Sequence, residues 1–171
     1  YYDYPNQRIN LLRKYGNHPF PTEQKLEAEA CDYCYQGTIS DKKIESSQQE
    51  DKMNNAPEQY VVKRCSDTKY NGGWHTDLTA DGLNALRWKE LPFRSGESII
   101  RFRYASEGEI TVCCQIGNEM TQKVTLPATG NAWEETEVAV YTRDTRGYAD
   151  FNLAVIEGAI SLNYVEIITN K

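Results

Sequence analysis

The clearest pattern in the chain is the alternation of apolar and polar residues in its second half. Residues 98–105, for example, place Ile100, Phe102 and Tyr104 on one side and Arg101 and Arg103 on the other. A period of two residues is typical of a strand that is buried on one face only. The same pattern predicts strands at residues 60–65, 85–91, 98–105, 110–116, 121–126, 134–141, 150–156 and 160–169.

Turn-forming residues separate these segments, as in Pro92 to Gly96 and in the Ser106-Glu-Gly-Glu turn. Strands of this length, divided by Gly, Pro, Asn and Asp, predict an all-β fold, either a sandwich or a barrel. Residues 37–57 are polar and show no period, so we predict a loop there. Residues 66–84 are rich in turn residues, and a short helix is expected only at residues 9–15.

Residues 1–23 differ in character from the rest of the chain. We interpret them as a linker or as the tail of a preceding domain, and residues 24–171 as one β domain of ordinary size. Because the chain begins with Tyr rather than Met, we expect a mature protein or a fragment of a larger one.

Composition excludes several classes of function. The net charge of −6 and the pI near 5.0 argue against a nucleic-acid footprint, and no apolar run approaches the length of a membrane span. The five cysteines include one C-x-x-C but no second pair at zinc spacing, and their pairing stays open. No G-x-S-x-G, phosphate-binding loop or H-E-x-x-H motif is present, so we predict a non-catalytic domain.

The stretch K-L-E-A-E-A-C at residues 25–31 contains two carboxylates close together. As a strand, it places Glu27 and Glu29 on one face and Leu26, Ala28 and Ala30 on the other. Two neighbouring carboxylates repel each other unless a positive charge lies beside them. That charge is either a basic side chain or a hard cation such as Ca²⁺, and the residues alone leave both possibilities open.

Aromatic residues also occur in predicted loops. Trp74, Trp133 and Tyr148 each lie beside Gly or Asn. Such a ring either stacks on the C–H face of a sugar or caps the end of the core. Trp88 lies in mid-strand, where a core position is favoured over an exposed position on the sheet face.

Four segments in order resemble a known family. They are the K-L-E-A-E-A opening, Ser98-Ile-Ile-Arg-Phe-Arg-Tyr-Ala, Thr125-Leu-Pro-Ala-Thr-Gly and Ile160-Ser-Leu-Asn-Tyr-Val-Glu-Ile. From Gln24 to Thr169 the chain resembles a carbohydrate-binding module of family 6, or its relatives in families 35 and 36. The resemblance implies a β-sandwich of jelly-roll, galactose-binding-like type. It also implies a structural Ca²⁺ held by Glu27, Glu29 and Asn163.

The resemblance further implies a sugar site in the loops at one end of the sandwich, where two aromatic rings enclose the sugar and an Asn bonds its hydroxyls. The tryptophan of the family's T-G-x-W loop corresponds to Trp133. The first ring is absent at its usual place, residues 78–81, so Trp74 or His75 is the expected substitute, and Ser161 stands at the Asn position. Family members also bind sugar on the sheet face, where Trp88 and Tyr104 are the candidates.

The predicted function is therefore that of a secreted or cell-surface accessory module. It would bind a polysaccharide or oligosaccharide and hold an attached glycoside hydrolase or polysaccharide lyase against its substrate. The alternative is a structural or protein-interaction β-sandwich that has lost glycan binding.

Overall fold

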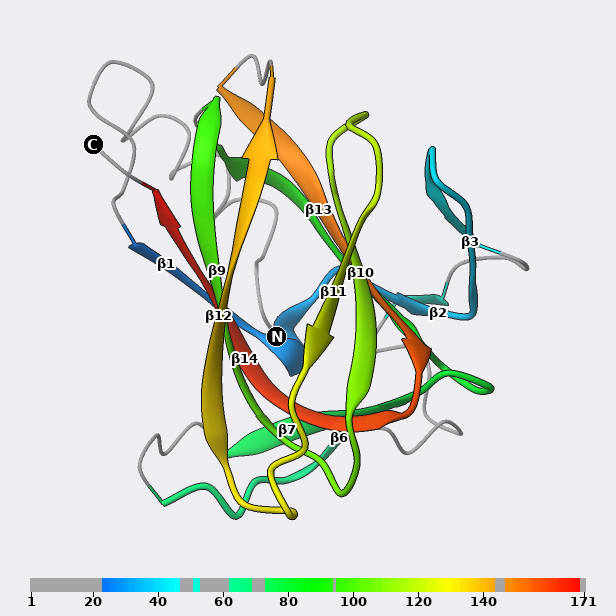
Figure 1. Cartoon of the computed structure of the whole chain (residues 1–171), viewed down its shortest axis with the longest axis vertical. Helices are drawn as coiled ribbons and strands as arrows, with labels where there is room; N and C mark the ends of the chain where they lie inside the picture. The colour runs from blue at the N-terminus through cyan, green and yellow to red at the C-terminus, as the bar shows by residue number, and fades with distance from the viewer. Residues whose placement is uncertain are drawn as a thin grey trace.

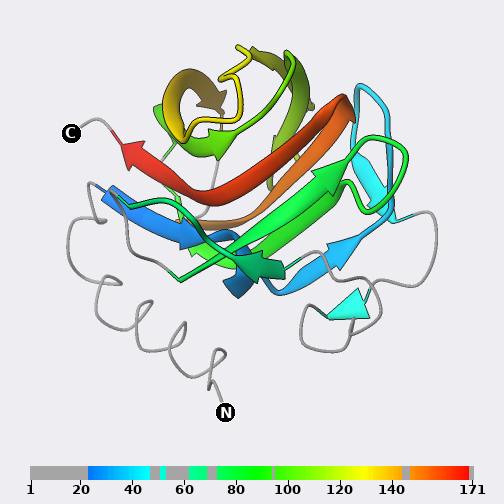
Figure 2. The same cartoon turned by 90° about the horizontal axis from the view of Figure 1, so that it is seen from below.

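The computed structural model describes residues 23–46, 51–52, 62–68, 73–93, 95–143 and 147–169. These residues form two six-stranded sheets that pack face to face, plus a separate hairpin (Figures 1 and 2). The predicted all-β sandwich is confirmed. Within the described residues, no helix has the length and apolar character needed to cross a bilayer. The helix expected at residues 9–15 lies outside the described residues.

Sheet A has the order β12-β9-β14-β7-β6, with β1 also paired to β14. Its strands are β1 (Glu23–Glu27), β6 (Val62–Arg64), β7 (Trp74–Thr79), β9 (Gly96–Ala105), β12 (Glu134–Thr142) and β14 (Ala159–Thr169). The long β14 pairs with β7 through its first residues and with β1 through its last, while β9 runs along its other edge. All these pairings are antiparallel, which is typical of sandwiches.

Sheet B has the order β11-β10-β13-β8-β2-β5. Its strands are β2 (Tyr33–Tyr35), β5 (Asp51–Lys52), β8 (Ala85–Pro92), β10 (Ile110–Ile116), β11 (Gln122–Leu126) and β13 (Tyr148–Glu157). The strands predicted in the second half of the chain are therefore confirmed, with ends that differ by one or two residues.

The alternating side chains of both sheets meet in one core, which includes Trp88, Phe102, Phe151, Leu162 and Val165. Burial of these apolar surfaces is the main stabilising contribution to the sandwich. A second, smaller cluster lies on the outer face of sheet B, around Tyr35, Ile44, Ala85, Cys113 and Ala154. The neighbouring Cys113 and Cys114 thus face opposite sides of β10, and all five cysteines are free thiols.

Residues 37–57 were predicted to be a loop, and this prediction was wrong for the described part. β3 (Gly37–Ile39) and β4 (Ile44–Ser46) form a hairpin, which lies at the outer side of sheet B in Figure 1. Gln115 holds it in place, since its side chain accepts from the amide of Ile44 at 3.0 Å and donates to the carbonyl of Lys42 at 3.0 Å. The hairpin was missed because strands of three residues are too short to show a period.

The prediction that residues 25–31 form one strand was also wrong in part. β1 ends at Glu27, and Ala28–Ala30 form a single 3-10 turn, η1. Leu26 and Ala28 are nevertheless buried, as the alternation required. The turn begins directly after Glu27, which pairs with Tyr164 in β14. Glu27 is therefore a strand residue and Glu29 a turn residue, so the two do not share one strand face.

Candidate functional site

The strand β7 positions the polar side chains of the candidate sugar site. Its sequence, Trp-His-Thr-Asp-Leu-Thr, alternates between two environments. Thr76 and Leu78 are fully buried toward the core, whereas His75 and Asp77 share the outer face of sheet A. The strand was not predicted because turn residues on both sides dominate the segment. The alternation of Thr76 and Leu78 with His75 and Asp77 was the signal that could have revealed it.

Asp77 is the centre of a hydrogen-bonded group in which three side chains meet. Its Oδ1 accepts from Ser161 Oγ at 2.7 Å and lies 3.0 Å from His75 Nε2, and its Oδ2 lies 2.7 Å from Lys63 Nζ. Burial acts to raise the pKa of Asp77, but the hydrogen bonds from Lys63 and Ser161 outweigh it and hold that pKa below its usual value. Asp77 is therefore ionised and organises the group. Sequence reasoning missed both Asp77 and Lys63.

Trp133 completes this end of the sheet. Its ring lies edge-to-face against His75, with centroids 5.4 Å apart, and its Nε1–H donates to Ser66 Oγ at 3.0 Å. The ring is half-buried, whereas Trp74, at the start of β7, is 51% exposed. The structure thus brings the predicted residues His75 and Ser161 together around Asp77 and places Trp133 against His75. Trp74 directly precedes His75 in β7, so alternation directs its exposed ring toward the other face of the strand.

Trp88, the remaining predicted sugar-binding residue, is a structural residue, and that assignment was wrong. Its side chain is completely buried, stacks on Phe151 at 5.7 Å and donates from Nε1 to the carbonyl of Glu27 at 3.3 Å. Tyr104 is equally buried, and its hydroxyl donates to the carbonyl of Pro127 at 2.7 Å. Neither ring is accessible to a sugar, because both belong to the core between the sheets.

The candidate calcium residues lie where β1, η1 and β14 meet. Burial, with a further contribution from the negative charge of Glu27, raises the pKa of Glu29 to about 7. Asn163 is fully buried in β14 and donates from Nδ2 to Asp67 Oδ2 at 3.1 Å. Among the described residues, no group of three or more His, Cys, Asp or Glu side chains is arranged to hold a metal ion. A metal site here would therefore combine two carboxylates with amide or carbonyl oxygens.

The chemistry of this group fits a hard cation. Within the described part of the chain, Glu27 Oε2 and Glu29 Oε2 are buried and have no hydrogen-bond partner. Buried carboxylate oxygens normally have a donor or a cation beside them. Lys25 lies on the other side of the Glu27 carboxylate, with its Nζ 3.4 Å from Oε1. Two buried carboxylate oxygens without hydrogen-bond donors are ligands of the kind that Ca²⁺ prefers.

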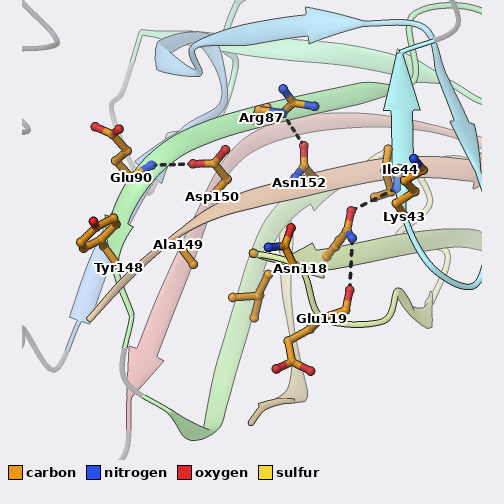
Figure 3. A pocket seen from close by; sticks show the side chains of 13 residues that line it. Lys43, Ile44, Arg87, Glu90, Asn118, Glu119, Tyr148, Ala149, Asp150 and Asn152 are labelled. Carbon is orange, nitrogen blue, oxygen red and sulfur yellow. Dashed lines mark hydrogen bonds between the residues drawn. The ribbon is translucent and has the colours of Figure 1, made fainter. Parts of the chain in front are cut away.

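A separate pocket of about 720 Å³ lies on the outer face of sheet B. Figure 3 shows Arg87, Glu90, Asp150 and Asn152 along its floor and the β3–β4 hairpin, with Lys43, at one side. Arg87 Nε donates to Asn152 Oδ1 at 2.8 Å, and Asp150 Oδ1 accepts from the amide of Glu90 at 2.9 Å. The ring of Tyr148, 53% exposed, stands at its rim. This pocket, rather than Trp88 or Tyr104, is the candidate for binding on a sheet face.

Solved structures of known proteins share this fold. The C-terminal family 6 carbohydrate-binding module of LamC, a marine laminarinase from Zobellia galactanivorans, is 19% identical with a TM-score of 0.59, over 86% of this chain and 99% of that one. The family 35 module of Abf62 from Cellvibrio japonicus is 16% identical with a TM-score of 0.55, over 87% and 94%. An exo-β-1,3-galactanase from Phanerochaete chrysosporium, solved with galactose, is 13% identical with a TM-score of 0.58. That match covers 90% of this chain but 31% of the galactanase. No curated protein matches the chain.

The two packed antiparallel sheets define a β-sandwich of the jelly-roll class, the fold of the carbohydrate-binding modules just described. The family model described as carbohydrate binding module (family 35) matches residues 59–167, more than half of the chain. The chain therefore belongs to this family, whose members are non-catalytic binding domains. Residues 1–33 match a second family model, a domain of unknown function named DUF5010.

Proposed function

We propose that the glycan binds at the end of sheet A, on the ring of Trp133. The observation that carries this proposal is the contact of the Trp133 ring with His75, which together with Ser161 converges on Asp77. Indole rings offer a flat apolar face for the C–H groups of a sugar, and the neighbouring polar side chains can bond its hydroxyls. Because one short glycan makes few such contacts, we expect weak affinity.

We further propose that the module is secreted or displayed at the cell surface and tethers a catalytic domain to a polysaccharide. The match of residues 1–33 to a different domain family supports a neighbouring domain. The galactanase match supports it too, because there the same fold accounts for about a third of a catalytic chain. Tethering raises the effective concentration of the attached enzyme at its substrate without any new catalytic group.

The same proposal includes a structural Ca²⁺ held by Glu27, Glu29 and Asn163. The orphaned oxygens Glu27 Oε2 and Glu29 Oε2 support it. When bound, the cation would supply the positive charge that lets both buried carboxylates remain ionised. β1 and β14 are the first and last strands of the described domain. A cation with ligands near both strands would therefore link the two ends of the domain.

Affinity electrophoresis against a panel of soluble polysaccharides tests the sugar site. The proteins to compare are the wild type, Trp133→Ala, Trp74→Ala and Tyr141→Ala, because Tyr141 is a similarly exposed ring (59%) on another part of sheet A. We expect at least one polymer to retard the wild type and the Tyr141 variant but not the Trp133 variant. If no polymer retards the wild type, the alternative of a structural β-sandwich without glycan binding replaces this proposal.

A further inference from the structure

The ring of Trp133 is held by two contacts. One is the edge-to-face contact with His75, with centroids 5.4 Å apart, and the other is the hydrogen bond from its Nε1–H to Ser66 Oγ at 3.0 Å. A contact between two rings by itself leaves an indole free to turn over about its χ2 bond, which has two broad minima. The hydrogen bond selects one of the two orientations, because only one of them directs Nε1 at the serine. Ser66 therefore sets which way the indole faces.

The Ser66 side chain is itself exposed, and its position depends on the buried residue that follows it. The carboxylate of Asp67 is 1% exposed and accepts two hydrogen bonds from Arg103, from Nε at 2.7 Å and from Nη2 at 2.9 Å. Asn163 Nδ2 donates to the same carboxylate at 3.1 Å. A guanidinium and a carboxylate that pair through two parallel hydrogen bonds have one planar geometry. This pair fixes Asp67 and, through one peptide bond, the backbone of Ser66.

Arg103 also lies beside the strand that follows Trp133. In the register of β12 and β9, Glu135 stands directly opposite Arg103, and it follows Trp133 by two residues. β9 pairs with β12 along one edge and with β14 along the other, so it is an interior strand of sheet A. Both partners of the hydrogen bond between Trp133 and Ser66 are thus fixed relative to Arg103, one through β12 and one through Asp67.

We propose that Arg103 and Asp67 are positioning residues of the sugar site, which act through Ser66 to hold Trp133 in the orientation on which a sugar stacks. This role rests on the proposed function, since it concerns the same ring. Both side chains are buried, so they act on the glycan through the indole and not by contact. A buried ion pair is often no more stabilising than an apolar pair of similar volume, whereas its single geometry suits a positioning role.

An indole that is already oriented loses little freedom when a sugar stacks on it. A loosely held ring has to be ordered on binding, and that cost is subtracted from the affinity. For one ordered side chain the cost corresponds to about a 2-fold to 10-fold loss of affinity. We expect a loss of this size when either the Ser66 hydroxyl or the pair of Asp67 with Arg103 is removed.

The indole N–H of Trp133 in the glycan-free chain provides a direct test. The chain has three tryptophans, so a ¹H–¹⁵N spectrum contains three indole signals, which Trp→Phe variants assign. In Asp67→Asn, we expect the Trp133 signal to shift and its exchange with solvent to become several-fold faster. Trp88 Nε1 donates to the carbonyl of Glu27 in the core, and its signal should stay unchanged. A general loss of structure would move both signals, whereas a positioning role moves that of Trp133 alone.

Arg101→Gln is the matched control. Arg101 lies on the same face of β9, two residues before Arg103, and pairs with glutamates of β12 and β14. Its replacement removes ion pairs from that face and should leave the Trp133 signal in place. Ser66→Ala should reproduce the effect of Asp67→Asn, and Ser66→Thr, which keeps a hydroxyl, should retain the wild-type signal. In the Ser66→Ala background, Asp67→Asn should add no further change, because the route passes through the hydroxyl.

An unchanged Trp133 signal in Asp67→Asn would overturn the proposal, and so would an equal effect of Asp67→Asn with and without Ser66. If Asp67→Asn does not fold, the double variant Asp67→Leu/Arg103→Met removes both charges together and takes its place. Affinity electrophoresis of the same variants measures the consequence for binding. Full affinity in a variant whose Trp133 signal has moved would overturn the positioning role. If no polymer retards the wild type, the proposed function fails, whereas the N–H signals still show whether Arg103 and Asp67 hold the ring.

Discussion

Ser161 and Asp77 stand opposite each other in the β14–β7 register, and the serine hydroxyl donates to Asp77 Oδ1 at 2.7 Å. The serine was predicted to bond a sugar directly, at the position of an asparagine in related modules. In this chain its hydroxyl is directed at Asp77 instead. The carboxylate, already held by Lys63 and close to His75, is then the group that fixes the polar side of the site.

Replacement of Asp77 by Ala is expected to weaken glycan binding more than replacement of Ser161 by Ala. Without the carboxylate, Ser161, His75 and Lys63 all lose their common partner, and hydrogen bonds to a charged group are worth roughly 1.5–3 kcal/mol each. Ser161→Ala removes one of those bonds and leaves the others. We expect about a 10-fold loss of affinity for Asp77→Ala, a factor that corresponds to about 1.4 kcal/mol, and less for Ser161→Ala, both measured by affinity electrophoresis. Equal losses in the two variants would show that Asp77 does not organise the site.

Trp88→Ala should destabilise the chain, because Trp88 belongs to the core and is 0% exposed. Truncation of a buried Trp or Phe typically costs about 3–5 kcal/mol, through lost burial and the cavity left behind. Trp74→Ala is the matched control, since its ring is 51% exposed and surface changes usually fall within about 0.5 kcal/mol. Urea unfolding of both variants measures the difference. A Trp88 variant as stable as the wild type would contradict the core assignment.

The core strands could be predicted from the sequence because a sandwich interior imposes a period of two. In residues 98–105, for example, Ile100, Phe102 and Tyr104 are all fully buried. The same rule places Cys113 and Cys114 on opposite sides of one strand, and Cys114 indeed lies in the core while Cys113 lies in the smaller outer cluster. It did not distinguish a core aromatic from a sheet-face aromatic, since Trp88 and an exposed ring both fit the alternation. Which face of a strand is covered depends on the second sheet, which lies far away in sequence.

The site was predictable only in part, for a related reason. Trp133, His75 and Ser161 could be selected by their chemical type and by resemblance, but Asp77, Lys63 and Ser66 could not. These three residues gain their roles through pairing of β7 with β14 and β6 and through the long-range contact of residue 66 with residue 133. The end of the first strand at Glu27 could not be predicted either. The alternation from Lys25 to Ala30 fits a continuous strand as well as a strand that is followed by a turn.

Removal of calcium is expected to lower the thermal stability of the chain. A ligand that binds only the folded state at 100 times its dissociation constant stabilises that state by about 2.7 kcal/mol. For a domain of this size, such a change moves the Tm by roughly 5–10 °C. Calorimetry in calcium and in EGTA measures the shift. The Glu27→Gln/Glu29→Gln double variant should show no difference between the two buffers, whereas a calcium effect that survives in it would place the ion elsewhere.

The metal-free chain should lose stability as the pH rises from about 4.5 to about 7. Burial and the charge of Glu27 raise the pKa of Glu29 in the folded state from 4.5 to about 7. Between these values the folded state holds a proton that the unfolded state has released, so stability falls as the pH increases. Because Glu29 is only partly buried, solvent screening reduces the full value of about 1.4 kcal/mol per pKa unit, and we expect a loss of about 1–2 kcal/mol. Urea unfolding in EGTA at pH 5 and pH 8 measures it, and Glu29→Gln should reduce the difference. Stability that rises over this range in EGTA would contradict the shift.

Tyr148→Ala separates the sugar site on sheet A from the pocket on the outer face of sheet B. Tyr148 is 53% exposed at the rim of that pocket, and no described contact links its ring to Trp133 or His75. If glycan binds on Trp133, the Tyr148 variant keeps the wild-type retardation on every polysaccharide that retards the wild type. Because the ring is exposed, its removal should also leave stability within about 0.5 kcal/mol. Arg87→Ala, on the floor of the same pocket, is the second test, since its side chain holds Asn152. A loss of retardation in both variants, with Trp133→Ala unaffected, would move the binding site to sheet B.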